Sequence, residues 1–232
     1  MRSPDFSNVL VVMDFDGTIT TSDCLRSVLS RHVEILPALL GAAREAGLSE
    51  TETLVQAVAQ LDVPRTQLIK EFTDAATLRE GFHDFLRAVL ERGARVSLIS
   101  VGFIEGIEAV WRREELPPVM MLASTLGGDE RVGYHLLIDE RFGDCPVCGK
   151  GMCKGPAVDA LRRPGDFVAV FGDGRRDLCM ARRADAIFAR DHLAALCERD
   201  GLAYNPLTEF TTALRDLEGS LAAWAEESHS SQ

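Results

Sequence analysis

Short, mainly apolar runs recur along this chain, and each is followed by a polar turn and then by a helical pattern. The runs are residues 9–13, 95–99 and 167–171. Apolar runs of this length are typical of strands that are buried on both faces of a parallel sheet. Strands that alternate with helices predict an α/β fold, in which a mainly parallel, Rossmann-like sheet carries helices on both faces.

The first run is separated from the second by a long stretch that shows helical patterns alone. Apolar residues recur there at helical spacing in three stripes, which Pro37 and Pro64 interrupt. We therefore expect an all-helical cap at residues 21–78, inserted after the first strand. The remaining segments, 1–20 and 79–232, would then form the core of the fold.

Composition excludes several classes of function. The 232 residues include 36 acidic and 25 basic side chains, which gives a net charge of −11. Such a field repels nucleic-acid backbones and anionic membranes, so we expect neither as a partner. The N-terminal stretch lacks the apolar core of a signal peptide, no apolar run is long enough to span a bilayer, and six cysteines are too few for a disulfide scaffold. These features predict a cytoplasmic protein, either a monomer or a homodimer.

Polar side chains stand at the ends of the predicted strands and at one helix start. These residues are Asp14, Asp16, Ser100, Lys154, Asp173 and Asp177. A parallel sheet brings the carboxyl ends of its strands to one edge, where α/β proteins place their sites. Taken singly, the aspartates and Ser100 could be turn residues or helix caps, and Lys154 could be a solvated surface lysine. Together, in this order, they predict one catalytic site.

The predicted site has the chemistry of a metal-assisted phosphate site. Clustered carboxylates repel one another unless a cation neutralises them, and an all-oxygen donor set favours Mg²⁺, which commonly serves a phosphate group. The expected metal ligands are Asp14, Asp16, Asp173 and Asp177.

The other predicted roles concern phosphate. Lys154, the Ser100 hydroxyl and the backbone N–H groups of Val101 and Gly102 can hold phosphoryl oxygens. Asp14 can attack phosphorus as a carboxylate nucleophile and form an aspartyl-phosphate. Asp16, two residues further on, can act as general acid and then as general base.

The four segments resemble known motifs. Asp14-Phe-Asp-Gly-Thr-Ile-Thr20, Ser100, Lys154 and Gly172-Asp-Gly-Arg-Arg-Asp177 are similar to the motifs of phosphatases of the haloacid dehalogenase superfamily. The resemblance implies the same roles: Asp14 as nucleophile, Asp16 as acid and base, and Mg²⁺ near Asp173 and Asp177. A helical cap directly after the first motif resembles the phosphoserine phosphatase-like branch.

A narrower resemblance extends over essentially the whole chain. Segments 78–82, 153–154 and 189–191 and the C-terminal helices look like the 2-hydroxy-3-keto-5-methylthiopentenyl-1-phosphate phosphatases of methionine salvage. Phosphoethanolamine/phosphocholine phosphatases are nearby relatives. Gly174 departs from the pattern, since the salvage enzymes carry a serine there. The motifs are specific for mechanism and much less so for substrate.

The expected function is a Mg²⁺-dependent phosphomonoester phosphatase that acts on a small phosphorylated metabolite. Phosphoserine, phosphoethanolamine and phosphocholine are alternative substrates, and phosphotransfer is an alternative reaction at the same site. A receiver-type signalling module is a reading from a different class, because it also forms a phospho-aspartate. The pairing of Asp14 with Asp16 and the cap argue against it, since a receiver needs neither a leaving-group acid nor a lid.

Two acidic residues beyond the motifs are candidates for contact with substrate. Asp23 lies just after the first motif, where its carboxylate could face the leaving group or simply cap the following helix. Glu80 stands where the chain returns from the cap to the core, and it is open to the same two interpretations.

A cysteine-rich loop stands apart from these motifs. Cys145, Cys148 and Cys153 have a spacing compatible with a Zn²⁺ site, which needs a fourth ligand; His135 or an acid could supply it. The alternative is a set of reduced thiols in a tight loop that positions Lys154. The other three cysteines are expected in helix cores.

Overall fold

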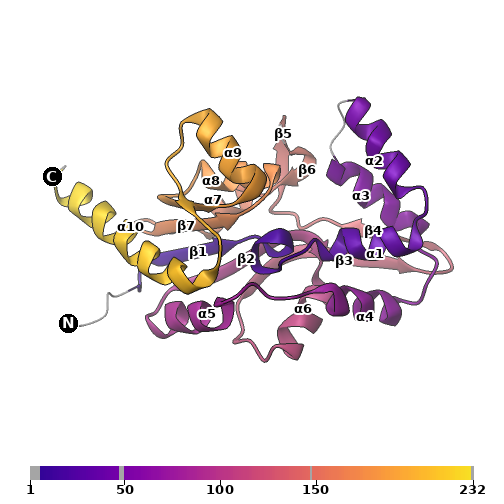
Figure 1. Ribbon diagram of the computed structural model, residues 1–232, viewed down its shortest axis with the longest axis horizontal. Helices are drawn as coiled ribbons and strands as arrows, with labels where there is room; N and C mark the ends of the chain where they lie inside the picture. The colour runs from indigo at the N-terminus through magenta and orange to yellow at the C-terminus, as the bar shows by residue number, and fades with distance from the viewer. Residues whose placement is uncertain (1–5, 47–49, 147, 231–232) are drawn as a thin grey trace.

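The computed structural model describes residues 6–46, 50–146 and 148–230, and Figure 1 shows their arrangement. Within these residues a seven-stranded sheet has the order β4-β3-β2-β1-β7-β8-β9, and β5 and β6 form a separate hairpin. All neighbours in the large sheet are parallel except β3 and β4. The strands are β1 Val9–Met13, β2 Arg95–Phe103, β3 Met120–Asp129, β4 Gly133–Leu137, β5 Gly143–Cys145, β6 Gly149–Cys153, β7 Phe167–Gly172, β8 Ala186–Ala189 and β9 Asn205–Pro206.

The central position of β1 explains why its sequence is apolar without interruption. The strand pairs with β2 on one side and β7 on the other, and all five of its residues are buried. Alternate side chains face opposite layers: Val11 packs with the first layer of helices, whereas Leu10 and Val12 pack with the second. Neither face of the strand can therefore carry a polar residue.

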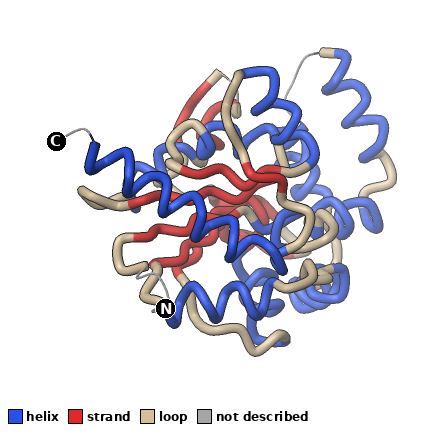
Figure 2. Tube along the Cα trace, turned by 60° about the vertical axis from the view of Figure 1, so that its left-hand side comes forward, coloured by secondary structure: helices blue, strands red, loops and turns tan. Residues whose placement is uncertain are grey.

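Helices cover both faces of the sheet, as Figures 1 and 2 show. On one face α5, α6 and α10 bury aromatic side chains, including Phe85 and Phe210, against Phe171 of β7. On the other face α7 and α8 pack Val158 and Met180 against the sheet. These helices, with α9, are α5 Phe82–Glu91, α6 Ile104–Arg113, α7 Gly155–Leu161, α8 Leu178–Ala181, α9 Asp191–Asp200 and α10 Phe210–Ser230.

The insertion after the first strand is helical, as its patterns predict. The chain leaves the core at Thr20 and returns at Leu78, and these two residues form an antiparallel bridge. The Arg79 N–H also donates to the Ile19 carbonyl over 2.8 Å, so both connecting strands are tied together. Between them lie α1 Cys24–His32, α2 Leu36–Glu45, α3 Glu50–Ala57, the short helix η2 Val58–Gln60 and α4 Arg65–Ala75. That residues 21–78 behave as a domain of their own stays a prediction.

The cap packs directly on the core through α4. The Phe72 ring stacks on Phe15 with centroids 5.9 Å apart and contacts Phe103 at 4.7 Å. Gly106 of α6 makes this approach possible, because a Cβ there would lie 2.6 Å from the Phe72 ring. Arg113 of α6 adds a polar contact by donating to the Ala76 carbonyl, just beyond the end of α4, over 2.7 Å. The cap is therefore seated on the same core that carries the first motif.

Some elements differ from the sequence prediction. The cysteine loop folds as the β5–β6 hairpin, and β2 continues to Phe103 through a register shift. After β7 the chain forms η3 Arg175–Asp177 and then the four-residue α8. β9 was not anticipated, because two residues carry no periodic pattern. None of the helices within the described ranges combines the length and apolar character that crossing a bilayer needs.

Candidate active site

The first motif forms a tight loop at the carboxyl end of β1. Asp14 is still extended, and the turn η1 Phe15–Ile19 follows it directly. Gly17 has a φ of +78°, and a Cβ there would lie 2.5 Å from Asp173 Oδ2. A residue without a side chain is needed here for both reasons. The turn brings the first and last motifs into contact.

Arg79 fixes this loop from the return strand of the cap. Its guanidinium donates to the carbonyls of Gly17 at 2.8 Å, Thr18 at 3.0 Å and Thr20 at 3.2 Å. The sequence reasoning gave this arginine no role, because a side chain that holds backbone carbonyls leaves no local pattern. Its position directly after the helical insertion is the one available signal.

Lys154 stands at the centre of the site, at the start of α7. Its ammonium donates to Asp14 Oδ1 over 2.5 Å and to Asp177 Oδ1 over 2.8 Å, and all three residues are buried. Asp177 Oδ2 accepts the backbone N–H groups of Asp173 and Gly174 at 3.1 and 2.9 Å. The loop after β7 is thereby closed around the carboxylate that holds the lysine.

Three carboxylates converge on one point, and their arrangement fits a divalent cation. Among the described residues, oxygens of Asp14, Asp173 and Asp177 lie within 4.8 Å of one another. When all three carboxylates are ionised, the ammonium of Lys154 offsets only one of their three negative charges. An all-oxygen donor set with this charge suits Mg²⁺. The Asp16 carboxylate is not part of this group, and its role as a metal ligand stays a prediction.

The electrostatics of these groups follow from their burial. Burial, and then the charge of Asp177, raises the pKa of Asp14 to about 6. Burial, and then the charges of Asp177 and Asp14, raises the pKa of Asp173 to about 8. Burial alone would lower the pKa of Lys154, but Asp14 and Asp177 outweigh it and raise that pKa. The lysine is therefore charged, whereas Asp14 and Asp173 need a cation to be fully ionised at neutral pH.

Asp16 faces the entrance to the cap. Its Oδ1 accepts the N–H of Cys24, the first residue of α1, over 2.7 Å. Burial, and then the neighbouring charge of Asp23, raises its pKa well above the usual value. A raised pKa favours the protonated form of the carboxyl group, which is the form that a general acid needs.

The end of β2 brings the second motif beside Asp16. The Gly102 N–H donates to Ser100 Oγ over 3.0 Å, and both residues are buried. A Cβ on Gly102 would lie 3.2 Å from both Asp16 Oδ2 and Ser100 Oγ. The side chain of Val101 packs into the core beneath them. The structure thus brings Ser100 and Gly102 to the site, and phosphate binding by 100–102 stays a prediction.

The two candidates for substrate contact lie in different surroundings. Asp23 caps α1, since its Oδ1 accepts the N–H of Arg26 over 2.7 Å, which is the structural alternative that the sequence left open. Glu80 is exposed, and its carbonyl accepts the N–H of Phe210 over 2.8 Å. A role toward substrate stays a prediction for both residues.

The cysteine loop gathers a different fourth member from those considered. Sulfur atoms of Cys145, Cys148, Cys153 and Cys179 lie within 4.8 Å of one another. The sequence placed Cys179 in a helix core, because one cysteine on a short helix carries no ligand pattern. His135 is outside this group and stands on β4, paired with Gly127 of β3.

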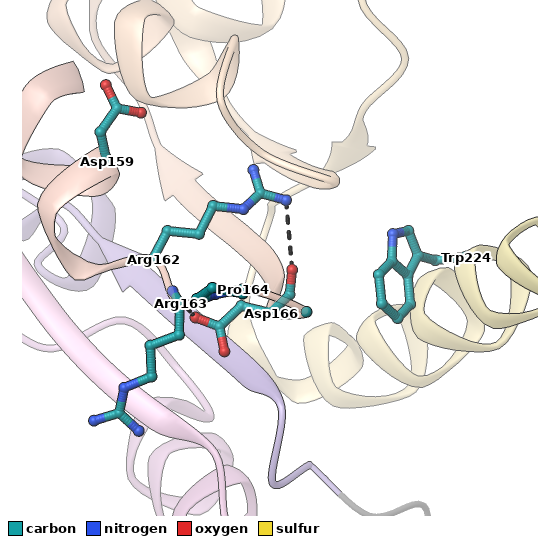
Figure 3. A pocket seen from close by; sticks show the side chains of 7 residues that line it. Asp159, Arg162, Arg163, Pro164, Asp166 and Trp224 are labelled. Carbon is teal, nitrogen blue, oxygen red and sulfur yellow. Dashed lines mark hydrogen bonds between the residues drawn. The ribbon is translucent and has the colours of Figure 1, made fainter.

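A shallow pocket of about 440 Å³ lies elsewhere in the fold (Figure 3). It is lined by Asp159, Arg162, Arg163, Pro164, Gly165, Asp166 and Trp224. These residues precede or flank the start of β7, whereas Asp173 follows the end of that strand. Arg95 and Asp166 form an ion pair at this edge. The pocket is therefore at the opposite edge of the sheet from the carboxylates.

Comparison of sequences finds phosphatases. A family model described as haloacid dehalogenase-like hydrolase matches residues 11–182. The 2-hydroxy-3-keto-5-methylthiopentenyl-1-phosphate phosphatase of Bacillus mycoides is 28% identical over 219 residues, covering 90% of this chain and 96% of that protein. The protein of the same name from Lysinibacillus sphaericus is 26% identical over 215 residues, covering 89% and 92%.

Comparison of structures finds the same architecture. Phosphoserine phosphatase from T. onnurineus has a TM-score of 0.66 at 17% identity, with 94% of this chain and 98% of that chain covered. A probable phosphoserine phosphatase from Vibrio cholerae has a TM-score of 0.71 at 18% identity, with 96% and 68% covered. At these identities the likeness shows the fold, a parallel sheet with helices on both faces.

Proposed function

Because the chain belongs to the haloacid dehalogenase-like hydrolases, we propose that it is a Mg²⁺-dependent phosphatase of small phosphomonoesters that works through an aspartyl-phosphate on Asp14. The observation that carries the proposal is the convergence of Asp14, Asp173 and Asp177, two of which contact the buried Lys154 ammonium. The proposed nucleophile Asp14, the Lys154 ammonium and a set of carboxylates that suits a divalent cation lie together at the carboxyl edge of the sheet. Phosphoryl transfer needs this combination, since it depends on positioning and on charge neutralisation.

The chain's own residues divide the first half of the reaction between them. Asp14 Oδ attacks phosphorus, and the bond from phosphorus to the substrate oxygen breaks. Asp16 gives its proton to that leaving oxygen, as its raised pKa allows. Lys154 and the residues 100–102 hold the phosphoryl oxygens while Asp14 becomes the aspartyl-phosphate. Bound Mg²⁺, held by Asp14, Asp173 and Asp177, supplies positive charge that offsets the repulsion between phosphate and carboxylates.

The second half regenerates the enzyme. The Asp16 carboxylate takes a proton from water as that water attacks the phosphorus of the aspartyl-phosphate, and the bond between phosphorus and Asp14 breaks. Inorganic phosphate leaves, and both carboxyl groups return to their starting states. The cap, seated on the core through Phe72, would exclude other water during the first step.

The test compares Asp14→Asn with the wild-type chain. Release of inorganic phosphate from p-nitrophenyl phosphate is measured with Mg²⁺ and with excess chelator. We expect turnover in the wild type that needs Mg²⁺ and is lost in Asp14→Asn, while Asp62→Asn, an exposed cap residue, serves as the control. Substantial turnover by Asp14→Asn would contradict the mechanism. A phospho-form that persists with Mg²⁺ would favour a receiver, and transfer to an alcohol instead of water would favour a phosphotransferase.

The named relatives support one substrate first, 2-hydroxy-3-keto-5-methylthiopentenyl-1-phosphate, which would place the enzyme in methionine salvage. Phosphoserine, phosphoethanolamine and phosphocholine are the alternatives. The values of kcat/KM for all four decide between them, and Asp23→Asn would change KM selectively if its carboxylate faces the leaving group. A cytoplasmic location is part of the proposal, because none of the six cysteines, all within the described residues, forms a disulfide. The choice between monomer and homodimer falls to size-exclusion measurement.

A further inference from the structure

Four of the six cysteines, all of them within the described residues, form one cluster outside the carboxylate site. Cys145, Cys148 and Cys153 come from the β5–β6 hairpin, and Cys179 comes from α8. Cys145 is half-buried and the other three are buried. The sulfur of Cys179 lies 3.7 Å from that of Cys145 and 3.6 Å from that of Cys148. All four sulfurs lie within 4.8 Å of one another, so they form a single cluster.

These separations match a tetrahedral metal site. Zn²⁺ with Zn–S bonds of about 2.3 Å holds its sulfur ligands about 3.8 Å apart. A disulfide would instead need a separation of about 2.05 Å. The backbone N–H of Cys148 also points at a ligand sulfur, since it donates to Cys145 Sγ over 3.2 Å.

In its described residues, the hairpin that carries three of the cysteines has few apolar partners. β5 has three residues and β6 has five, and two-stranded hairpins of this size are marginal on their own. The apolar contacts around it consist largely of the sulfurs themselves, with Met152 and the cap residue Val55. An arrangement with so small an apolar core is typically stabilised by a metal or by another cross-link.

We propose that Cys145, Cys148, Cys153 and Cys179 bind one Zn²⁺ as a structural site. Four thiolates fill a tetrahedral shell and leave no open position, so the metal would take no substrate. Four thiolates around Zn²⁺ carry a net negative charge, and a cation stands beside them: the Arg183 guanidinium donates to the Cys179 carbonyl over 2.8 Å. Soft sulfur ligands also separate this site from the oxygen set that suits Mg²⁺.

The place of the cluster in the chain gives the metal a positioning role. Cys153 directly precedes Lys154, and Cys179 follows Asp177 by two residues. The metal would therefore tie together the two segments whose side chains meet at the 2.8 Å contact between Lys154 and Asp177. This role matters to catalysis only if the proposed function holds. Zinc content and thermal stability do not depend on it.

The test measures metal in the full-length chain, purified with reductant and without a histidine tag. We expect about one Zn²⁺ per chain by mass spectrometry of the elements. Cys148→Ser and Cys179→Ser should lose the metal, whereas Cys197→Ser, which removes a buried thiol outside the cluster, should keep it. Cys145→His should retain zinc that Cys145→Ser loses, because imidazole can replace a thiolate as ligand.

A second measurement keeps the proposal testable if a serine variant does not fold. Removing zinc from the wild-type chain with a chelator should lower its Tm, and adding zinc back should restore it. In Co²⁺-substituted protein, visible absorption typical of tetrahedral thiolate coordination should appear. A metal-free wild-type chain with six reactive thiols, or a Tm that the chelator leaves unchanged, would overturn the proposal. Disulfides among the four cysteines in the freshly reduced protein would overturn it too.

Discussion

Replacing Lys154 with methionine removes the ammonium that contacts both Asp14 and Asp177. Methionine keeps the length of the side chain and discards its charge. At an effective dielectric constant of about 20, two unit charges 2.8 Å apart attract by about 6 kcal/mol. Much of this attraction is offset by the cost of desolvating the ions. Breaking one side of a buried ion pair therefore costs about 3–5 kcal/mol in the free energy of unfolding.

That cost should depend on pH in a defined direction. Lys154 favours the charged form of Asp14, whose pKa is about 6 in the folded chain, so the variant raises this pKa further. Above pH 6 the variant must bind protons that the wild type has released, and its stability deficit grows with pH. Below pH 6 Asp14 is protonated in both proteins, and the deficit shrinks. At about 2–4 °C per kcal/mol, the Tm at pH 8 should fall by roughly 6–20 °C.

Thermal melts at pH 5 and pH 8, without Mg²⁺, measure this difference. Lys70→Met is the matched control, because Lys70 forms an exposed ion pair with Asp74 on α4, and exposed pairs of this kind contribute little to stability. Phosphate release by the Lys154 variant should also fall by at least ~100-fold, since the variant lacks the ammonium that would hold the transferring phosphoryl group. A variant with the wild-type Tm at pH 8 and wild-type turnover would refute the assigned role of the ion-pair network.

Three further outcomes follow from the structure. Gly17→Ala should abolish activity, because the added Cβ would displace Asp173. Gly201→Ala is the control, since Gly201 also has a positive φ but no atom near the added Cβ. It should lower the free energy of unfolding by about 1 kcal/mol and leave turnover intact. Gly106→Ala should overpack the contact between cap and core and lower the free energy of unfolding by about 1–3 kcal/mol. Gly219→Ala, in open space on α10, should stabilise the chain. Equal melting temperatures of the two variants would contradict the packing argument. The Asp173 pKa of about 8 means that the folded chain holds a proton which the unfolded chain releases near pH 4, so stability without Mg²⁺ should fall as pH rises between these values. Mg²⁺ should therefore raise the Tm more at pH 8 than at pH 5, and equal shifts would count against a cation at these carboxylates.

The parts of this fold that the sequence predicts are those that depend on residues close together in the chain. β1 and β7 are buried on both faces, so each appears as an uninterrupted apolar run. Asp14 and Asp173 were found as candidates because parallel strands bring their carboxyl ends to one edge. Both inferences need only neighbouring residues and one rule of topology.

The parts that the sequence did not predict depend on contacts between distant segments. Cys179 joins three cysteines that lie 26 or more residues earlier, across a helix and a strand, and no spacing rule connects them. Arg79 acts on backbone carbonyls, which carry no residue identity. The Asp16 carboxylate is oriented by one N–H donor at the start of the cap. The spacing of acidic residues in the sequence does not predict which rotamer this side chain adopts.

The two carboxyl groups of the first motif are held by different parts of the molecule. Asp14 is fixed by Lys154 of the core, whereas Asp16 accepts its hydrogen bond from the first residue of the cap. Phe15 lies between them and stacks on Phe72 of α4, so the seating of the cap reaches the residue between nucleophile and acid. Changes in the cap can therefore alter leaving-group recognition and acid placement without disturbing the phosphate chemistry below. In the proposed mechanism, the core motifs would therefore set the reaction and the cap would set the choice of substrate.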